Sequence, residues 1–260
     1  MAANASDVQI ESRDGVLRVT INRSEKRNAL SADVLHALAG VFASNADDAR
    51  LKVAVLRGAG EQCFAAGGDL RELASITTLE GASDMARDAK ASLEAIRQFP
   101  VPVVAALNGD AMGGGAELAV ACDFRIAAAH ARIGFVQGRL NIATAWGGGI
   151  DLMRLVGTSR ALGLMCRGDM LTGAEAAALG LVDAVAREHE SLDELITDFI
   201  APIVKQAPQV LRAFKAVAKG VRTGLSRAEL NDLETRMFAQ TWVHEDHWTA
   251  AEKITSKWRS

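Results

Sequence analysis

Residues with chemical potential are concentrated at a run of glycines. "DAMGGGAELAVACD", residues 110–123, places Gly113, Gly114 and Gly115 at the start of an expected helix and Glu117 in its first turn. Without a Cβ, glycine lets a ligand approach the backbone, and the free N–H groups of a helix N-terminus attract negative charge. No Gly-Lys-Ser or Gly-Lys-Thr ending follows, so this is not a Walker phosphate loop. The run suits an oxyanion, although by position alone Glu117 is more typical of a surface acid that offsets the helix dipole.

A second glycine junction occurs earlier in the chain. In "CFAAGGDLREL", residues 63–73, an apolar stretch is followed by Gly67 and Gly68, and Asp69 is placed to cap a helix. If Gly68 and Gly114 each aim one backbone N–H at the same point, they form an oxyanion hole of the kind that stabilises enolates and tetrahedral adducts. Spacing alone leaves open whether the two junctions converge.

The glycine junctions lie in a pattern of alternating strands and helices. The segments 16–22, 52–58 and 101–109 are rich in apolar residues and indicate buried strands. Ser31 is placed to cap one intervening helix. A second intervening helix carries its inner apolar residues at Met85, Ala89, Leu93 and Ile96. Alternation of this kind predicts the α/β class.

Beyond about residue 190 the apolar periodicity is helical throughout. Capping boxes predict helices that begin after Ser191 and Ser226. We therefore expect an α/β part over residues 1–190 and an all-helical part over residues 191–260. The last stretch carries three tryptophans that either oligomer contacts or the same domain could bury, Trp242, Trp248 and Trp258.

Composition limits the classes of partner. The 260 residues are 49% hydrophobic and 23% charged, with a formal net charge of -3, as in an ordinary soluble protein. That charge gives no electrostatic footprint for nucleic acid, and the basic face of "RAFKAVAKGVR", residues 212–222, is interpreted as solvated. Neither a secretory signal nor an apolar segment long enough to span a bilayer is evident. We expect a cytoplasmic protein with no nucleic-acid or membrane partner.

The sequence gives little support for a metal site or a disulfide bond. Cys63, Cys122 and Cys166 lie in apolar runs without a CxxC pair, so we expect reduced core residues. His244 and His247 are three residues apart on an expected helix, but a solvated helix face is the simpler interpretation of that spacing. We expect no bound metal.

Four segments together carry a family resemblance. They are "INRSEKRNALS" (21–31), "CFAAGGDLREL" (63–73), "NGDAMGGGAELAVACDFRIA" (108–127) and "LTGAEAAALGLVDAV" (171–185). Their order and approximate spacing resemble those of the crotonase, or enoyl-CoA hydratase/isomerase, family, from about residue 8 to 258. The resemblance implies a crotonase-type spiral of ββα units with an all-helical C-terminal portion. It also implies a homotrimer or a dimer of trimers.

The same resemblance implies a substrate and the residues that bind it. Family members bind acyl-CoA thioesters and stabilise a thioester enolate with two backbone amides, which by motif position are those of Gly68 and Gly114. No separate cofactor is implied, because CoA is part of the substrate. The variable segment 76–87 is expected to border the acyl pocket and makes Met85 a candidate contact. The positions implied for contact with the CoA thioester are Lys26, Arg27, Ala29, Ala66, Asp69, Leu70, Arg71 and Lys257.

One catalytic position departs from the family pattern. Family hydratases use two glutamates, one activating water and one exchanging a proton with the α-carbon; Glu117 matches the first, and Gln137 occupies the place of the second. An amide supplies no titrating proton. The resemblance still favours a hydratase-like acyl-CoA lyase, whose catalytic residues would be Glu117 and Gln137.

Two alternatives to hydration remain. The stretch "IGFVQGRLNIATAWGGG", residues 133–149, is similar to that of ethylmalonyl-CoA decarboxylase-like members. In a decarboxylase of ethylmalonyl- or methylmalonyl-CoA, Gln137 would hold the departing carboxylate and Glu117 would reprotonate the enolate. The other alternative is a non-catalytic acyl-CoA-binding protein.

Overall fold

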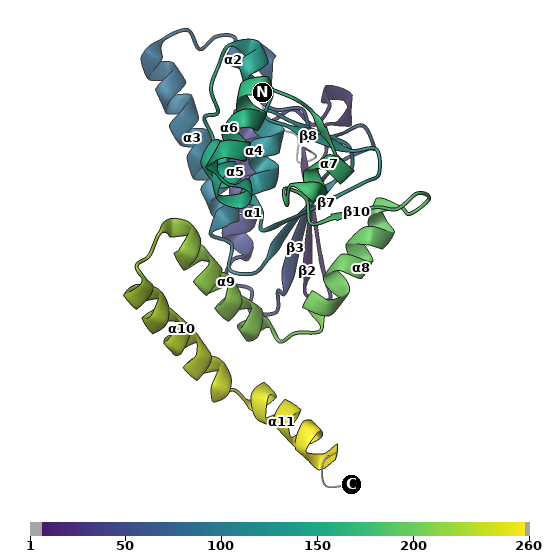
Figure 1. Ribbon diagram of the computed structural model, residues 1–260, viewed down its shortest axis with the longest axis vertical. Coiled ribbons are helices and arrows are strands. Elements are labelled where there is room, and N and C mark those ends of the chain that lie inside the picture. The colour runs from purple at the N-terminus through teal and green to yellow at the C-terminus, as the bar shows by residue number, and fades with distance from the viewer. Residues whose placement is uncertain (1–6, 258–260) are drawn as a thin grey trace.

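The chain folds into two β-sheets flanked by helices, and its last two helices project from this body as an arm (Figure 1). A computed structural model describes residues 7–257, with side chains as far as Thr255. The strands are β1 (Val8–Arg13), β2 (Val16–Ile21), β3 (Val53–Gly58), β4 (Cys63–Ala65), β5 (Val103–Leu107), β6 (Asp110–Met112), β7 (Phe124–Ala127), β8 (Arg132–Gly134), β9 (Leu171–Thr172) and β10 (Ala184–Val185). The helices are α1 (Ala32–Asn45), α2 (Leu70–Leu73), α3 (Leu79–Arg97), α4 (Gly114–Ala121), α5 (Gly148–Val156), α6 (Thr158–Arg167), α7 (Gly173–Ala178), α8 (Leu192–Val204), α9 (Pro208–Thr223), α10 (Arg227–Trp242) and α11 (Glu245–Lys257), with short 3-10 helices η1 (Ser24–Lys26) and η2 (Gln137–Leu140).

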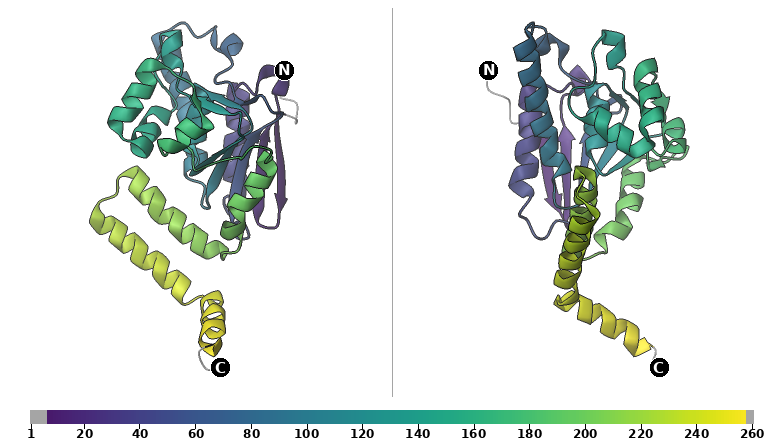
Figure 2. Two further views of the ribbon diagram at one scale, coloured as in Figure 1. Left: turned by 45° about the vertical axis from the view of Figure 1, so that its right-hand side comes forward. Right: turned by 60° about the vertical axis from the view of Figure 1, so that its left-hand side comes forward.

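The larger sheet is buried between helices. Among the described residues, its strand order is β1-β2-β3-β5-β7-β10, and every pair except β1 with β2 is parallel. The helices α1 and α3 lie on one face of this sheet and α8 on the other (Figure 2). Alternate residues of β2 face opposite sides, so Leu17 belongs to the core cluster that contains residues of α1 and α3, while Val16 belongs to the cluster that contains residues of α8. Burial on both faces explains why β3 and β5 are continuous apolar runs.

The smaller sheet brings the two glycine junctions together. Its strand order is β4-β6-β8-β9, and β4 pairs with β6 in parallel. Gly67 and Gly68 follow β4, and Gly113 and Gly114 follow β6. Because the carboxyl ends of parallel neighbours meet at one edge of a sheet, the junctions lie side by side.

Local signals in the sequence identified most of these elements. The expected strands became β2, β3 and β5, and the Ser31 side chain caps α1 by accepting a hydrogen bond from Val34 N at 3.2 Å. Both predicted C-terminal capping boxes are formed, at Ser191 and at Ser226. The sequence analysis did not identify β1, β6, β8, β9, α5 or α6.

The prediction of a solvated basic face on α9 is wrong. Lys215 is 3% exposed and forms an ion pair with Asp123, whose other oxygen accepts from Arg222 at 3.3 Å. Arg212 donates to the carbonyl oxygens of Ala46 and Asp48 at 3.2 and 2.6 Å. The body presents carboxylate and carbonyl acceptors to these basic side chains. This face of α9 therefore packs against the body. Desolvation by burial lowers the pKa of Lys215, opposed mainly by the charge of Asp123.

The cysteine prediction is correct for two of the three residues. Cys63 and Cys122 are buried, and burial raises the pKa of the Cys122 thiol to about 12. Cys166 is exposed, contrary to the prediction, because it lies outside the buried face of α6, although apolar residues precede it in the sequence.

The arm consists of α10 and α11. Within the described residues α10 buries none of its side chains, and α11 continues away from the body (Figure 1). Trp242 and Trp248 remain about half exposed, and their rings pack on each other with centroids 5.7 Å apart. Trp258 lies outside the described residues. No helix in the described part of the chain is long and apolar enough to cross a bilayer.

Candidate active site

The two glycine junctions meet at a cavity of about 150 Å³. Their closeness is evident from Gly67, where a Cβ would lie 3.3 Å from the Gly114 amide nitrogen. Gly67 and Gly113 have φ of 98° and 54°, backbone conformations that side chains rarely adopt. The cavity is lined by Ala66, Gly67, Gly68, Leu70, Leu73, Met85, Gly113, Gly114, Glu117, Val136, Gln137, Leu140, Ile142, Ala143, Ala145 and Trp146.

Gly68 and Gly114 present backbone N–H groups at this cavity. Within the described residues, neither amide donates a hydrogen bond to the protein. Gly114 is the first residue of α4, so its N–H is one of the unpaired donors at the helix start. Two free donors at adjoining junctions are the groups from which an oxyanion hole is built.

The Trp146 ring stands against both of these glycines. A Cβ on Gly114 would lie 2.3 Å from Trp146 Cζ3, and a Cβ on Gly68 would lie 3.6 Å from Cζ2 of the same ring and 2.7 Å from Leu73 Cδ1. Glycine is therefore required at Gly114 for packing as well as for access to the backbone. Trp146 lies in the stretch 133–149 that the sequence analysis compared with decarboxylase-like members, but it was not included among the site residues.

Glu117 is buried in the wall of the cavity. It is 2% exposed, so its interpretation as a surface acid is wrong. Its Oε1 accepts from Gln137 Nε2 at 2.9 Å and from Ala145 N at 3.3 Å. Its Oε2 accepts from Trp146 N at 2.8 Å and from Gly148 N at 2.9 Å. All of these partners are donors, which is the surrounding that an ionised carboxylate needs.

Burial and hydrogen bonding act in opposite directions on this carboxyl. Desolvation raises the pKa of Glu117 above its ordinary value, while the backbone amides of Gly148, Trp146 and Ala145 and the Gln137 side chain lower it; the net direction is upward. A buried carboxyl with a raised pKa in a cavity is suited to taking up and returning a proton.

Gln137 is next to Glu117, as the resemblance implied for a pair of catalytic side chains. It opens η2, is 8% exposed, and directs Nε2 at the carboxylate. Its Oε1 is buried without a hydrogen-bond partner in the described structure. Gln137 therefore helps to hold Glu117, which is the single titrating side chain among the described residues that line the cavity.

The first motif is fastened to the second by hydrogen bonds. The buried Asn28 side chain donates to Cys63 O at 2.6 Å, and Leu30 N donates to Gly67 O at 2.8 Å. Ala66 N donates to Arg27 O at 3.1 Å. The loop containing the predicted CoA residues is therefore held against the edge of the cavity.

The predicted CoA-binding residues are not all at the cavity itself. Ala66 and Leu70 line it. Asp69 caps α2 through Arg71 N at 3.3 Å and forms an ion pair with Arg23 at 3.3 Å. The remaining residues around the first two motifs are exposed or half-buried: Lys26, Arg27, Ala29 and Arg71.

Within one chain, Lys257 does not lie near the other residues that were predicted to bind CoA. It ends α11, at the far end of the arm from α2 (Figure 1), and its side chain lies outside the described residues.

A buried ion pair missed in the sequence supports the turn that holds Glu117. Arg97 Nε is 2.8 Å from Asp151 Oδ2, and Arg97 Nη2 donates to Trp146 O at 3.0 Å. Both charged side chains are less than 10% exposed. The sequence signal was a charged residue beside the apolar inner residues of α3, one position beyond Ile96.

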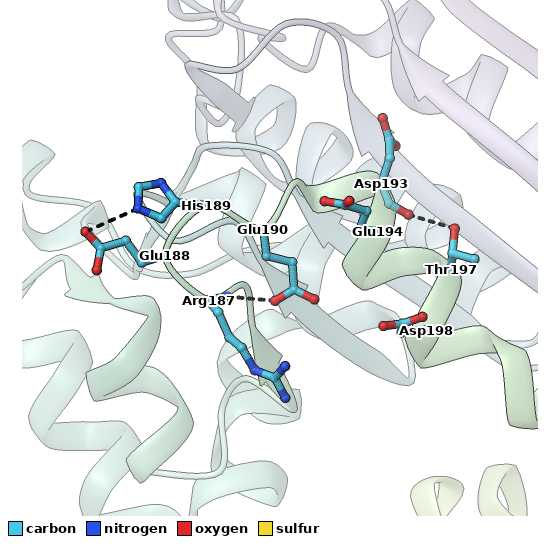
Figure 3. A pocket seen from close by; sticks show the side chains of 8 residues that line it. All are labelled: Arg187, Glu188, His189, Glu190, Asp193, Glu194, Thr197 and Asp198. Atoms are coloured by element: carbon cyan, nitrogen blue, oxygen red, sulfur yellow. Dashed lines mark hydrogen bonds and ion pairs between the residues drawn. The ribbon is translucent and has the colours of Figure 1, made fainter.

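Another hollow lies away from the catalytic motifs, at the start of α8 (Figure 3). Its side chains are mostly acidic, and the dashed lines join residues that are close together in the sequence, as from Arg187 N to Glu190 Oε2 at 2.8 Å. Among the described residues, no group of three His, Cys, Asp or Glu side chains is arranged to hold a metal ion. The lining residues are Arg187, Glu188, His189, Glu190, Asp193, Glu194, Thr197 and Asp198.

Comparisons with known proteins agree on one family. The enoyl-CoA hydratase/isomerase family model matches residues 11–260. A short-chain-enoyl-CoA hydratase of Clostridium acetobutylicum is 32% identical over 253 residues, covering 97% of this chain and 95% of the relative. Human mitochondrial methylglutaconyl-CoA hydratase is 32% identical over 244 residues, covering 91% and 70%. A solved enoyl-CoA hydratase of Bacillus anthracis has a TM-score of 0.89 and 31% identity over 96% of each chain. The chain therefore belongs to the enoyl-CoA hydratase/isomerase family and has the crotonase fold that its sequence motifs predicted.

Proposed function

We propose that this chain is an enoyl-CoA hydratase-like lyase that acts on an acyl-CoA thioester. The observation that carries the proposal is the juxtaposition of Glu117, a buried carboxylate with a raised pKa, with the free amides of Gly68 and Gly114 at one cavity. Amides of this kind stabilise the negative charge that develops on a thioester oxygen, and loss of one such donor costs about 3 to 4 kcal/mol.

In the proposed hydration, the thioester carbonyl accepts hydrogen bonds from the Gly68 and Gly114 amides. Glu117 takes a proton from water as the water oxygen bonds to the β-carbon, and the electrons of the double bond move into the enolate. The same carboxyl then returns the proton to the α-carbon. Glu117 therefore serves first as base and then as acid, because no second titrating side chain lines the described cavity.

Decarboxylation of a malonyl-type thioester is the second candidate. It is favoured by Gln137, since loss of carbon dioxide forms the enolate without any base and leaves Glu117 only one proton to donate. A non-catalytic acyl-CoA-binding protein is the third, and it differs from both in leaving every thioester unchanged.

A mass-spectrometric time course with crotonyl-CoA and ethylmalonyl-CoA distinguishes these functions, with Glu117→Ala as the blank. The proposal expects a gain of water on crotonyl-CoA that the variant lacks. Loss of carbon dioxide from ethylmalonyl-CoA, with crotonyl-CoA unchanged, would replace hydration by decarboxylation. Two unchanged thioesters that nevertheless bind would support the non-catalytic alternative.

A further inference from the structure

The cavity offers few polar contacts beyond its reaction centre. Of the residues that line it, Glu117 is ionisable, Gln137 is polar but neutral, and none is Lys, Arg or His. The Gln137 nitrogen lies 2.9 Å from Glu117 Oε1. A ligand anion bound by this amide would therefore lie close to a carboxylate and would find no cation among the lining residues.

The rest of the wall is apolar, and part of it is exposed. Leu70, Leu140 and Ile142 line the cavity, yet they are 60, 54 and 57% exposed. They come from α2 and from the end of η2 and the loop beyond it, so separate parts of the chain place apolar side chains at one opening. Covering such side chains removes apolar surface from water and is favourable.

We propose that the cavity selects an uncharged, apolar acyl chain that extends over Leu70, Leu140 and Ile142, and that it rejects acyl groups carrying a second carboxylate. The occupant of this surface is the acyl chain of the thioester, because the surface is continuous with the cavity that holds Glu117. This inference rests on the proposed function and specifies its substrate class.

The selection follows from desolvation. A second carboxylate entering the cavity loses its water, gains no counter-charge and lies near the negative Glu117. A methyl group in its place has no such desolvation cost and covers apolar side chains. Each fully buried CH₂ tightens binding by a factor of about four.

Calorimetric titration with saturated thioesters tests this without turnover. Pentanoyl-CoA and glutaryl-CoA have the same number of acyl carbons and differ in a terminal methyl or carboxylate. We expect pentanoyl-CoA to bind at least about tenfold more tightly. From butyryl-CoA to hexanoyl-CoA to octanoyl-CoA, we expect the Kd to fall by about fivefold or more at each step.

Matched variants assign the effect to the surface. Leu140→Gln should reduce the ratio of butyryl-CoA Kd to octanoyl-CoA Kd by about threefold or more. Leu162→Gln is the control, because Leu162 is 53% exposed on α6 and does not line the cavity; it should leave the ratio unchanged. Ile142→Lys, which supplies a cation at the opening, should tighten glutaryl-CoA binding by about fivefold or more.

The outcomes separate this inference from the proposed function. Equal or tighter binding of glutaryl-CoA overturns the inference and supports a malonyl-type substrate. A Kd that is independent of chain length also overturns the inference. Hydration of crotonyl-CoA together with tight glutaryl-CoA binding refutes the inference alone. Preference for pentanoyl-CoA without turnover of any enoyl-CoA supports the inference and refutes the hydratase.

Discussion

At Glu117 the residues that hold the carboxylate also determine how readily it gives up a proton. Three backbone amides and the Gln137 side chain donate to its two oxygens, and they lie in a wall that excludes most water. Burial favours the protonated form and the donors favour the ionised form. A carboxyl balanced in this way can act as base and then as acid within one turnover.

The pH dependence of hydration should report this balance. Glu117 must be ionised to accept a proton from water, so kcat/KM falls as the pH decreases through its pKa. Because burial raises the pKa of Glu117, the acidic limb should lie above 4.5, the ordinary value for a glutamate. Gln137→Met removes one donor that lowers this pKa and should move the limb further upward. A limb at or below 4.5 for crotonyl-CoA would show that Glu117 is not the base.

Gln137→Glu should restore a second proton carrier. The new carboxyl lies against Glu117 Oε1, and two carboxylates so close cannot both remain ionised, so the pair retains a proton. We expect the rate of crotonyl-CoA hydration to rise by about 100-fold, the lower end of general acid–base assistance. Gln137→Met is the control and should give no rise. An unchanged rate in Gln137→Glu would mean that proton supply to the α-carbon does not limit this enzyme.

At the scale of elements, α4 and the turn before α5 hold each other in place. The turn supplies the amides that bind Glu117 and the Trp146 ring that covers Gly114, and Arg97 of α3 holds the turn from behind. A change at the start of α4 should therefore also disturb the turn that holds Glu117.

Gly114→Ala tests this coupling. The added Cβ would lie 2.3 Å from Trp146 Cζ3, so the ring or the start of α4 must shift and the oxyanion donor moves. We expect kcat to fall by about 100- to 1,000-fold, the effect of losing one donor. Gly40→Ala in α1 is the matched control, since nothing lies within 4 Å of its Cβ; it should retain activity and gain about 0.5 to 1 kcal/mol of stability. Full activity in Gly114→Ala would contradict the coupling between the Trp146 ring and the position of the Gly114 amide.

Features that depend on residues close together in the sequence could be predicted, whereas features that depend on distant residues could not. The Ser31 cap and the capping boxes depend on residues three apart, so local spacing was sufficient. Lys215 could not be placed, because its partner Asp123 is 92 positions away and no local pattern indicates the pairing. Gly68 and Gly114 were identified as candidates, but their convergence depends on the parallel pairing of β4 with β6. Trp146 against these glycines is a contact of the same long-range kind.

At the scale of the whole molecule, the body and the arm differ in how they are stabilised. Ion pairs to Asp123 fasten α9 to the body, whereas α10 buries no side chain within the described part of the chain. Large apolar side chains lie exposed along the arm, at Phe238, Trp242, Val243, Trp248 and Ile254. Exposed apolar surface of this kind indicates a protein interface.

The arm should therefore be buried between copies of this chain. We expect light scattering coupled to size-exclusion chromatography to give three or six times the mass of the chain, as the family resemblance implies. Phe238→Arg places a charge among the exposed aromatic side chains and should lower that mass. Burying an unpaired cation in an interface is unfavourable and outweighs the free energy gained from the remaining contact. Leu162→Arg, at a leucine of similar exposure on α6, serves as the control and should leave the mass unchanged. If the unmodified protein has the mass of a single chain, the arm is not an oligomer contact, and its apolar side chains must be covered by another partner.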